Sequence, residues 1–149
     1  MIGAIIGDIV GSRFEFGAAP QEGFELFTPD CSYTDDTVCT VAVADAVLNE
    51  RSYQESLLDW CRRYPDPMGG YGNRFNRWIH SEHPQPMDSF GNGAAMRVSP
   101  IGWLFDEWED VLEEAKKSAI VSHNHPEGVK GAQCIAETDR KSTRLNSSH

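Results

Sequence analysis

The stretch best suited to chemistry is a run of four polar residues just ahead of an apolar segment. It reads Thr34-Asp35-Asp36-Thr37 and places two adjacent carboxylates between hydroxyl groups. Hard oxygen atoms gathered in one turn suit Mg²⁺, Mn²⁺ or Ca²⁺ and suit Zn²⁺ poorly. The alternative is structural, because Thr or Asp commonly caps a helix and acidic residues stabilise its first turn. At this point both interpretations stay open.

The apolar segment after these acids is the element that would position them. Residues 38–48 are rich in Ala and Val, contain neither Gly nor Pro, and are followed by Asn49. This pattern predicts a buried helix. The acidic residues therefore lie at its N-terminus, where unpaired N–H groups and the helix dipole stabilise negative charge.

The first segment of the chain is also predicted to be helical and to carry acids. Its glycines (Gly3, Gly7 and Gly11) recur every four residues, so they share one helix face and predict that another backbone approaches closely there. Asp8 and Glu15 are seven residues apart, about two turns, so both carboxylates project from a similar side. The spacing does not fit the alternative, a Gly-x-Gly-x-x-Gly dinucleotide loop.

A glycine-rich loop and a pair of histidines are the other candidates for ligand contacts. Gly91-Asn92-Gly93 precedes a predicted helical run, so its backbone N–H groups could cradle a phosphate; the alternative is a tight turn. Farther on, Pro126 is predicted to begin a helix just after His123 and His125. No third zinc ligand stands at a familiar spacing, which favours His123 as a hydrogen-bond donor to an anion.

The remaining periodic segments are helical as well, and the loops between them carry the prolines and glycines. Helices are predicted over residues 53–64, over a short aromatic stretch that contains Phe75 and Trp78, and over residues 107–121. Residues 16–33 and 83–87 show no sustained period and are predicted to be loops. The chain is therefore predicted to be all-α.

Composition narrows the class of protein. A length of 149 residues suits one domain, and the net charge of −10 argues against a general binder of nucleic acid or anionic membranes. No apolar stretch reaches membrane-spanning length. The four cysteines show no Cys-x-x-Cys spacing, and the N-terminus lacks a basic leader, so we expect free thiols and a cytoplasmic location. The oligomeric state is not readable from these features.

Three ordered motifs together resemble the ADP-ribosylglycohydrolase family. They are the segment from Gly3 to Gly11 with Glu15, the acidic run inside residues 33–37, and the glycine loop of residues 91–97. Ser122-His123 before the predicted helix at Pro126 resembles the family as well. The resemblance implies an orthogonal all-α helical bundle with a central cleft. It also implies a pair of Mg²⁺ ions, with Mn²⁺ as a possible replacement.

The resemblance also implies roles for individual residues. Metal ligands would be Thr34, Asp35, Asp36 and Glu15, and the catalytic carboxylates would be Glu15 and Asp36. The substrate would contact Asp8, Gly91, Asn92, Gly93, Ala94, Met96, Arg97 and His123. The implied substrate is an ADP-ribosylated protein or a small molecule that contains ADP-ribose, with hydrolysis at the anomeric carbon. The alternative is a module that binds ADP-ribose or a nucleotide without cleaving it.

One departure from the family pattern affects these expectations. Family members are longer, and a second acidic motif of the Asp-x-Asp-Thr type, which this chain lacks, completes their metal site. We therefore interpret residues 1–137 as the N-terminal portion of such a domain and expect little or no turnover from it. Residues 138–149 are polar, aperiodic and locally basic, which predicts a non-native or disordered tail.

Overall fold

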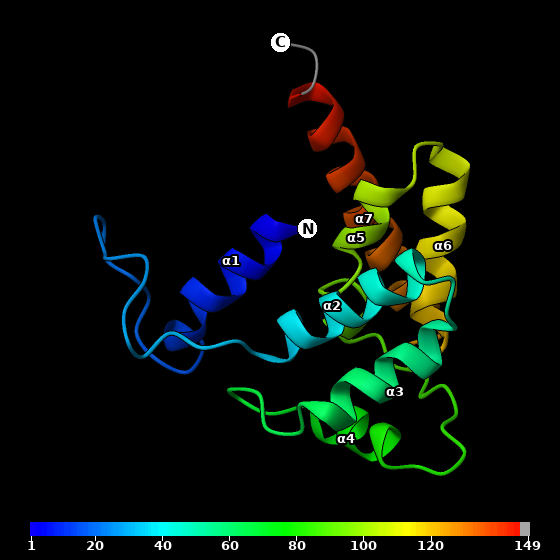
Figure 1. Ribbon diagram of the computed structural model, residues 1–149, viewed down its shortest axis with the longest axis horizontal. Helices are drawn as coiled ribbons and strands as arrows, with labels where there is room; N and C mark the ends of the chain where they lie inside the picture. Colours follow the sequence, from blue (N-terminus) through cyan, green and yellow to red (C-terminus); the bar gives the residue numbers. More distant parts are fainter. Residues whose placement is uncertain (147–149) are drawn as a thin grey trace.

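The computed structural model describes residues 1–146 and shows a chain of helices joined by loops (Figure 1). Within those residues the β pairing is limited to one isolated bridge between Thr34 and Met68. The predicted all-α class is therefore confirmed. In chain order the elements are α1 (Ile2–Gly11), the 3-10 turn η1 (Ser12–Phe14), α2 (Asp35–Leu48), α3 (Tyr53–Arg63), α4 (Asn73–Ile79), the 3-10 turn η2 (Asn92–Ala94), α5 (Ser99–Leu104), α6 (Trp108–Ile120) and α7 (Pro126–Asn146).

Helix α2 is the central element, as its apolar sequence predicted. Thr34 is its N-cap, and the Thr34 side chain accepts a hydrogen bond from the Asp36 N–H at 3.2 Å. Asn49 closes the helix, and half of the residues between are buried. The structural reading of the acidic run is thus correct for Thr34, which leaves the side chains of Asp35 and Asp36 free for another role.

Two hydrophobic clusters meet on α2, one on each side. The first joins Val43 to side chains of η2, α5, α6 and α7, among them Ala94, Val98, Ile101, Val111, Ala115 and Ala132. The second joins Val38, Cys39 and Ala42 to α3 and α4 through Leu57, Cys61, Phe75, Trp78 and Ile79. Since both clusters depend on α2, the position of its first turn is fixed by the packing of the whole bundle.

A buried polar contact fixes α3 along α2. The Ser56 hydroxyl donates to the Ala42 carbonyl at 2.7 Å, and the Trp60 indole N–H donates to the Asp45 carboxylate at 3.0 Å. These bonds link side chains one helical turn apart on α3 to the middle of α2. The predicted helices over residues 53–64 and 107–121 are confirmed as α3 and α6, each to within a residue or two of its predicted ends.

Two predicted helical runs are shorter in the structure. Helix α1 ends at Gly11, because the Ser12 hydroxyl donates to the Ile9 carbonyl and accepts the Ser32 N–H, after which the chain tightens into η1. Asp8 and Glu15 therefore do not share one α-helix. The run expected after Gly93 is only the short turn η2, and α5 begins at Ser99, with a proline in its first turn.

The C-terminal segment is more regular than predicted. Helix α7 begins at Pro126, as expected, but continues through residues 138–146, part of the segment that was expected to be a non-native or disordered tail. The Arg140 guanidinium pairs with Glu137 at 2.7 Å, an i,i+3 contact that supports the helix at this point. Residues 147–149 lie outside the described part, and a foreign origin of the tail stays a prediction. No helix in residues 1–146 is long and apolar enough to cross a bilayer.

Candidate functional site

Asp8 holds α1 against the first turn of α2. Its carboxylate accepts hydrogen bonds from the Thr34 N–H at 3.0 Å and the Thr34 hydroxyl at 2.6 Å. It also accepts from the Thr37 N–H at 3.3 Å and the Thr37 hydroxyl at 2.5 Å. These four bonds satisfy donors at the N-terminus of α2. Asp8, which was predicted to contact substrate, thus positions α1 against α2 in the structure.

Glu15, Asp35 and Asp36 come together around one hollow, as the sequence predicted. This hollow has a volume of about 410 Å³, and its remaining lining comes from residues 69–73, Asn92 and Met96. We call the three carboxylates the acidic wall. No Lys, Arg or His side chain of the described residues forms an ion pair with them. The early motif and the Asp-Asp motif therefore share a solvent-filled space that carries unpaired negative charge.

The acidic wall has the electrostatics of crowded carboxylates. The pKa of Asp35 is raised to about 6, first by burial and then by the neighbouring charges of Asp36, Glu15 and Asp8. The pKa of Asp36 is also raised, by burial and by the charges of Asp8 and Glu15. Each acid makes its neighbour harder to ionise, so a proton or a divalent cation in the hollow would relieve the repulsion.

The donor set suits a hard divalent cation only in part. Carboxylate oxygens are the ligands that Mg²⁺ and Mn²⁺ prefer. The Thr34 hydroxyl, however, already donates to Asp8 and accepts from the Asp36 N–H. Within the described residues no group of three or more His, Cys, Asp or Glu side chains is close enough to hold a metal ion. The predicted metal role of Thr34, Asp35, Asp36 and Glu15 stays a prediction.

A second hollow of about 130 Å³ adjoins the first and is lined by the glycine loop. The two hollows share Asp35, Gly72, Asn92 and Met96, so they adjoin, and we call them together the depression. The second adds Phe75 and the predicted substrate residues Gly91, Gly93, Arg97 and His123. We call Gly91, Asn92, Gly93, Arg97 and His123 the glycine-loop wall. Of the other predicted contacts, Ala94 belongs to the buried core and Asp8 lines neither hollow.

The glycine-loop wall is held by a chain of buried polar contacts. Arg97 is fully buried, and its Nη2 donates to the Ser118 carbonyl at 2.7 Å and to the Ser122 hydroxyl at 2.9 Å. The Ser122 hydroxyl lies 2.9 Å from His123 Nδ1. Because that hydroxyl already accepts from Arg97, its own hydrogen is available to Nδ1, which favours the tautomer with the proton on Nε2. Sequence reasoning noted Ser122 only as part of a motif and gave it no role.

His123 is packed so closely that only glycine fits opposite its ring. A Cβ atom on Gly93 would lie 2.7 Å from His123 Nε2 and 2.8 Å from Cε1. The pKa of His123 is lowered to about 4, first by burial and then by the charges of Arg97 and Arg74. The imidazole is therefore neutral at pH 7 and presents an N–H beside the glycine loop.

The alternative zinc pair is not assembled. The ring of His125 packs against Phe90, with 5.3 Å between the ring centroids, and its Nδ1 accepts the Glu127 N–H at 3.2 Å. His125 thus caps the start of α7. His123 instead faces the glycine loop.

One part of the site was given no role in the sequence analysis. Residues 69–72 line the first hollow, and Gly69 and Gly70 have φ values of +81° and +69°, a conformation that glycine adopts without strain. Met68 anchors this loop, because its N–H donates to the Tyr33 carbonyl at 3.1 Å. A Cβ on Gly69 would lie 3.3 Å from the Glu15 carboxylate. In the sequence, the adjacent glycines Gly69 and Gly70 were the feature that could have marked this loop as part of the site.

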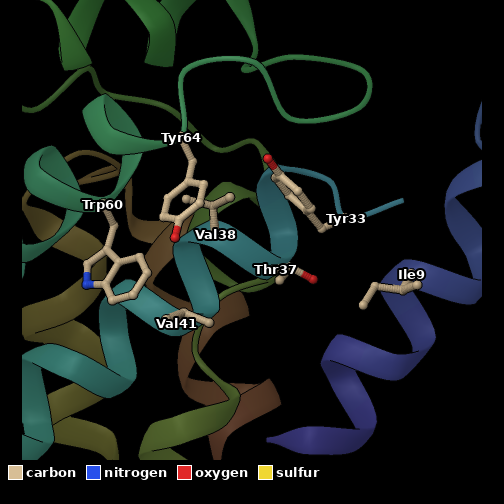
Figure 2. Close-up of a pocket in the computed structure, with 7 residues that line it drawn as sticks. All are labelled: Ile9, Tyr33, Thr37, Val38, Val41, Trp60 and Tyr64. Carbon is tan, nitrogen blue, oxygen red and sulfur yellow. The ribbon is translucent and has the colours of Figure 1, made fainter. Parts of the chain in front are cut away.

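A third hollow lies between α1 and the helices α2 and α3 and has a different character. Figure 2 shows Ile9 of α1 across from side chains of α2 and α3. The volume of this hollow is about 270 Å³, and its lining is apolar apart from the Thr37 and tyrosine hydroxyls. The residues that line it are Ile9, Tyr33, Thr37, Val38, Val41, Trp60 and Tyr64. It offers no acid, base or nucleophile at its surface, so it is not part of the candidate site.

Comparisons with known proteins agree with this geometry. The profile of the family described as ADP-ribosylglycohydrolase matches residues 1–144. The chain is 27% identical over 162 residues to ADP-ribosylhydrolase ARH3 of Xenopus tropicalis, a match that covers 89% of this chain and 46% of that protein. It is 28% identical over 167 residues to the Mus musculus protein of the same name, with 89% and 45% covered.

The chain therefore belongs to the ADP-ribosylglycohydrolase family. It spans less than half the length of the relatives that it matches. The family profile extends past residue 137, up to residue 144.

Proposed function

We propose that this chain forms the ADP-ribose-binding part of a metal-dependent ADP-ribosylglycohydrolase. The observation that carries the proposal is that the two hollows share four lining residues, which places the acidic wall and the glycine-loop wall next to each other. A ligand with a sugar ring and a diphosphate needs both an anion-binding surface and a set of groups beside the reacting carbon. The glycine-loop wall would supply the anion-binding surface, and the acidic wall would supply the groups beside the reacting carbon.

The glycine-loop wall would bind the diphosphate and the distal ribose. Backbone N–H groups around residues 91–93 can approach phosphate oxygens closely because glycine has no side chain. The His123 Nε2–H and the buried charge of Arg97 add a donor and a positive potential on the same side. This wall would thus hold the ligand in a fixed register along the depression.

The acidic wall would act on the bond at the anomeric carbon. Asp35 and Asp36, whose pKa values are raised, accept a proton more readily than ordinary aspartates. Either Glu15 or Asp36 would take the proton from water. Negative charge here would also stabilise a transition state with positive charge on the sugar. Bound Mg²⁺ or Mn²⁺, held by Asp35, Asp36 and Glu15 with help from Thr34, would polarise water and orient ribose hydroxyls.

A second candidate is a module that binds ADP-ribose without cleaving it. The specific observation in its favour is that the glycine-loop wall is assembled within this chain, whereas no three acidic, histidine or cysteine side chains of the described residues lie close enough to hold a metal ion. We therefore expect binding from this chain and little or no turnover. The acceptor would be an ADP-ribosylated protein or a small molecule that carries ADP-ribose.

Titration calorimetry with ADP-ribose, with and without Mg²⁺, tests the proposal. We expect Mg²⁺ to strengthen binding to the wild-type chain. Asp35→Ala should weaken ADP-ribose binding in the presence of Mg²⁺ about tenfold, which corresponds to about 1.4 kcal/mol. The matched control is Asp110→Ala, which deletes the same charge on the exposed surface of α6. Binding that ignores both Mg²⁺ and Asp35→Ala would favour the module, and absence of any ADP-ribose binding would refute both candidates.

Turnover is measured separately, by following release of ADP-ribose from an ADP-ribosylated peptide. The expected rate is at or near background. A rate comparable with that of a full-length relative would show that the acidic wall needs no further ligands, and it would contradict the expectation of an incomplete metal site.

A further inference from the structure

Two cysteine side chains meet in the core, across the contact between α2 and α3. All four cysteines of the chain are free thiols. The Cys39 sulfur, on α2, lies 3.8 Å from the Cys61 sulfur, on α3, and both side chains are fully buried. Within the described residues this is the one contact between two thiols. We call Cys39 and Cys61 the thiol pair.

The packing of α2 on α3 holds the thiol pair in contact. The two helices lie side by side (Figure 1). The bond from the Ser56 hydroxyl to the Ala42 carbonyl joins them about one turn away from the two sulfur atoms. A disulfide bond is about 2.05 Å long, so the sulfur atoms, now 3.8 Å apart, need to approach each other by less than about 2 Å. The fold has therefore already brought together the two ends of a cross-link.

The two thiols differ in acidity, which gives the pair one nucleophile. The hydrogen bond between them lowers the pKa of Cys61, and the positive charge of the buried Arg97 lowers it as well, against the opposing effect of burial. The same hydrogen bond and burial raise the pKa of Cys39. Because the thiolate is the form that an oxidant attacks, Cys61 would react first. Cys39 is then in place to attack the oxidised sulfur.

The thiol pair lies beneath the acidic hollow. Tyr71 lines that hollow and also packs against the hydrophobic cluster that contains both cysteines. Its hydroxyl lies 3.5 Å from the Cys61 carbonyl and donates to the Tyr64 carbonyl at 2.7 Å. On α2, Cys39 follows Asp35 by four residues, so it lies one helical turn behind the acidic wall. A displacement of Tyr71 would admit a molecule as small as hydrogen peroxide to the thiols, whereas a larger oxidant such as a peptide disulfide would stay outside.

We propose that Cys39 and Cys61 are a reversible oxidation site, with hydrogen peroxide as the oxidant and an intrachain disulfide as the product. In the first step the Cys61 sulfur attacks peroxide, a sulfur–oxygen bond forms, the oxygen–oxygen bond breaks, and one water leaves. In the second step the Cys39 sulfur attacks the Cys61 sulfenic acid, the disulfide forms, and the sulfenic oxygen leaves as a second water. Two electrons pass from the two thiols to one peroxide molecule.

The disulfide would clip α2 to α3 one turn behind Asp35. A dithiol reductant would open it again by thiol–disulfide exchange once the chain exposes the bond. The clip limits the freedom of the unfolded chain, so the oxidised form should be the more stable one. This proposal does not depend on ADP-ribose binding.

Peptide mapping by mass spectrometry tests the proposal with the full 149-residue chain. The parent protein carries Cys31→Ser and Cys134→Ser, because the exposed Cys134 would otherwise join two chains. After treatment with hydrogen peroxide we expect a mass loss of two hydrogen atoms and one cross-linked pair of peptides, both reversed by dithiothreitol. The oxidised protein should melt about 5 °C above the reduced protein.

Two single variants of the parent protein serve as controls. Cys39→Ser and Cys61→Ser each keep one thiol, so neither should show a rise in melting temperature that dithiothreitol reverses. Either serine could destabilise the core by itself. The comparison of the oxidised and reduced forms of the parent protein therefore decides the result, and it needs neither variant to fold.

Three outcomes would overturn the proposal. The first is that both thiols still titrate as free after peroxide treatment. The second is a sulfinic acid at either cysteine in place of the cross-link. The third is a cross-link that lowers the melting temperature, which would mean that the bond strains the packed helices and does not clip them together.

Discussion

The two walls of the depression are built in opposite ways. In the glycine-loop wall, Arg97, Ser122 and His123 hold one another through hydrogen bonds of 2.9 Å, and the pKa of the imidazole is shifted so that the ring stays neutral. In the acidic wall, Asp35 and Asp36 have no cationic partner among the described residues, and their pKa values are raised. The first wall is held by its own hydrogen bonds, whereas the carboxylates of the second repel one another. Substitutions should therefore lower the stability of the chain when they fall in the glycine-loop wall and raise it when they remove a carboxylate of the acidic wall.

The largest effect is expected from removing the centre of the glycine-loop wall. Arg97→Ala deletes a fully buried side chain and its bonds to Ser118 and Ser122, which should lower the free energy of unfolding by about 3 kcal/mol. Arg97→Met keeps the volume without the charge and should cost about 1 kcal/mol. Urea denaturation measures both. Equal losses would mean that the charge, and not the filled volume, stabilises this wall.

A smaller loss is expected from crowding the histidine. Gly93→Ala places a methyl group 2.7 Å from Nε2 and 2.8 Å from Cε1 of His123, which should cost about 2 kcal/mol of stability. Gly91→Ala is the matched control for stability, because its Cβ would lie 3.4 Å from the Ser89 hydroxyl, an ordinary contact. Thermal melts compare the two variants. If both behave alike, the contact between loop and ring does not matter.

The acidic wall should respond with a gain. Asp35→Asn removes a repelled carboxylate, so without metal at pH 7 the variant should be about 1 kcal/mol more stable than the wild type, a small gain because solvent screens this partly exposed group. As pH falls below 6, Asp35 takes up a proton in the folded chain, so the difference should shrink, and it should vanish only below the ordinary pKa of 3.8. Melting curves at about pH 7, 5 and 3.5 test this. A destabilised variant at pH 7 would show that the carboxylate is already paired.

The smallest effect concerns the pH dependence of His123. Its pKa is about 4 in the folded chain and near 6.5 in the unfolded chain, so between these values the unfolded state binds more protons and stability falls as pH falls. We expect His123→Gln to remove less than about 1 kcal/mol of the loss between pH 7 and pH 5, because the ring borders a hydrated hollow. Asp35 contributes equally to the pH dependence of the wild type and of His123→Gln, so its contribution cancels from the difference. An unchanged pH profile would contradict the neutral, desolvated imidazole.

Local features of the fold were predictable from the sequence. The apolar run before Asn49, the Thr34 cap and the proline at the start of α7 each act within one or two helical turns, so their effects can be read from neighbouring residues. The meeting of Glu15 with Asp35 was predicted from motif spacing and the family resemblance, and the shared hollow bears it out.

The features that were missed depend on tertiary contacts. Ser12 ends α1 by bonding to Ile9 and Ser32, the latter twenty residues away. Asp8 is engaged by threonines of another helix, so its side chain does not reach the ligand space assigned to it. The tail was expected to be non-native or disordered because it is polar and aperiodic, but Arg140 and Arg144 bind Asp106 in the loop before α6. In each case the deciding contact involves a residue that is not a sequence neighbour, so the local pattern could not predict it.

The four hydrogen bonds of Asp8 have a mechanical consequence. They join α1 to the opening turn of α2, which carries Asp35 and Asp36. A displacement of α1 would therefore move these two aspartates relative to residues 69–73, which line the same hollow.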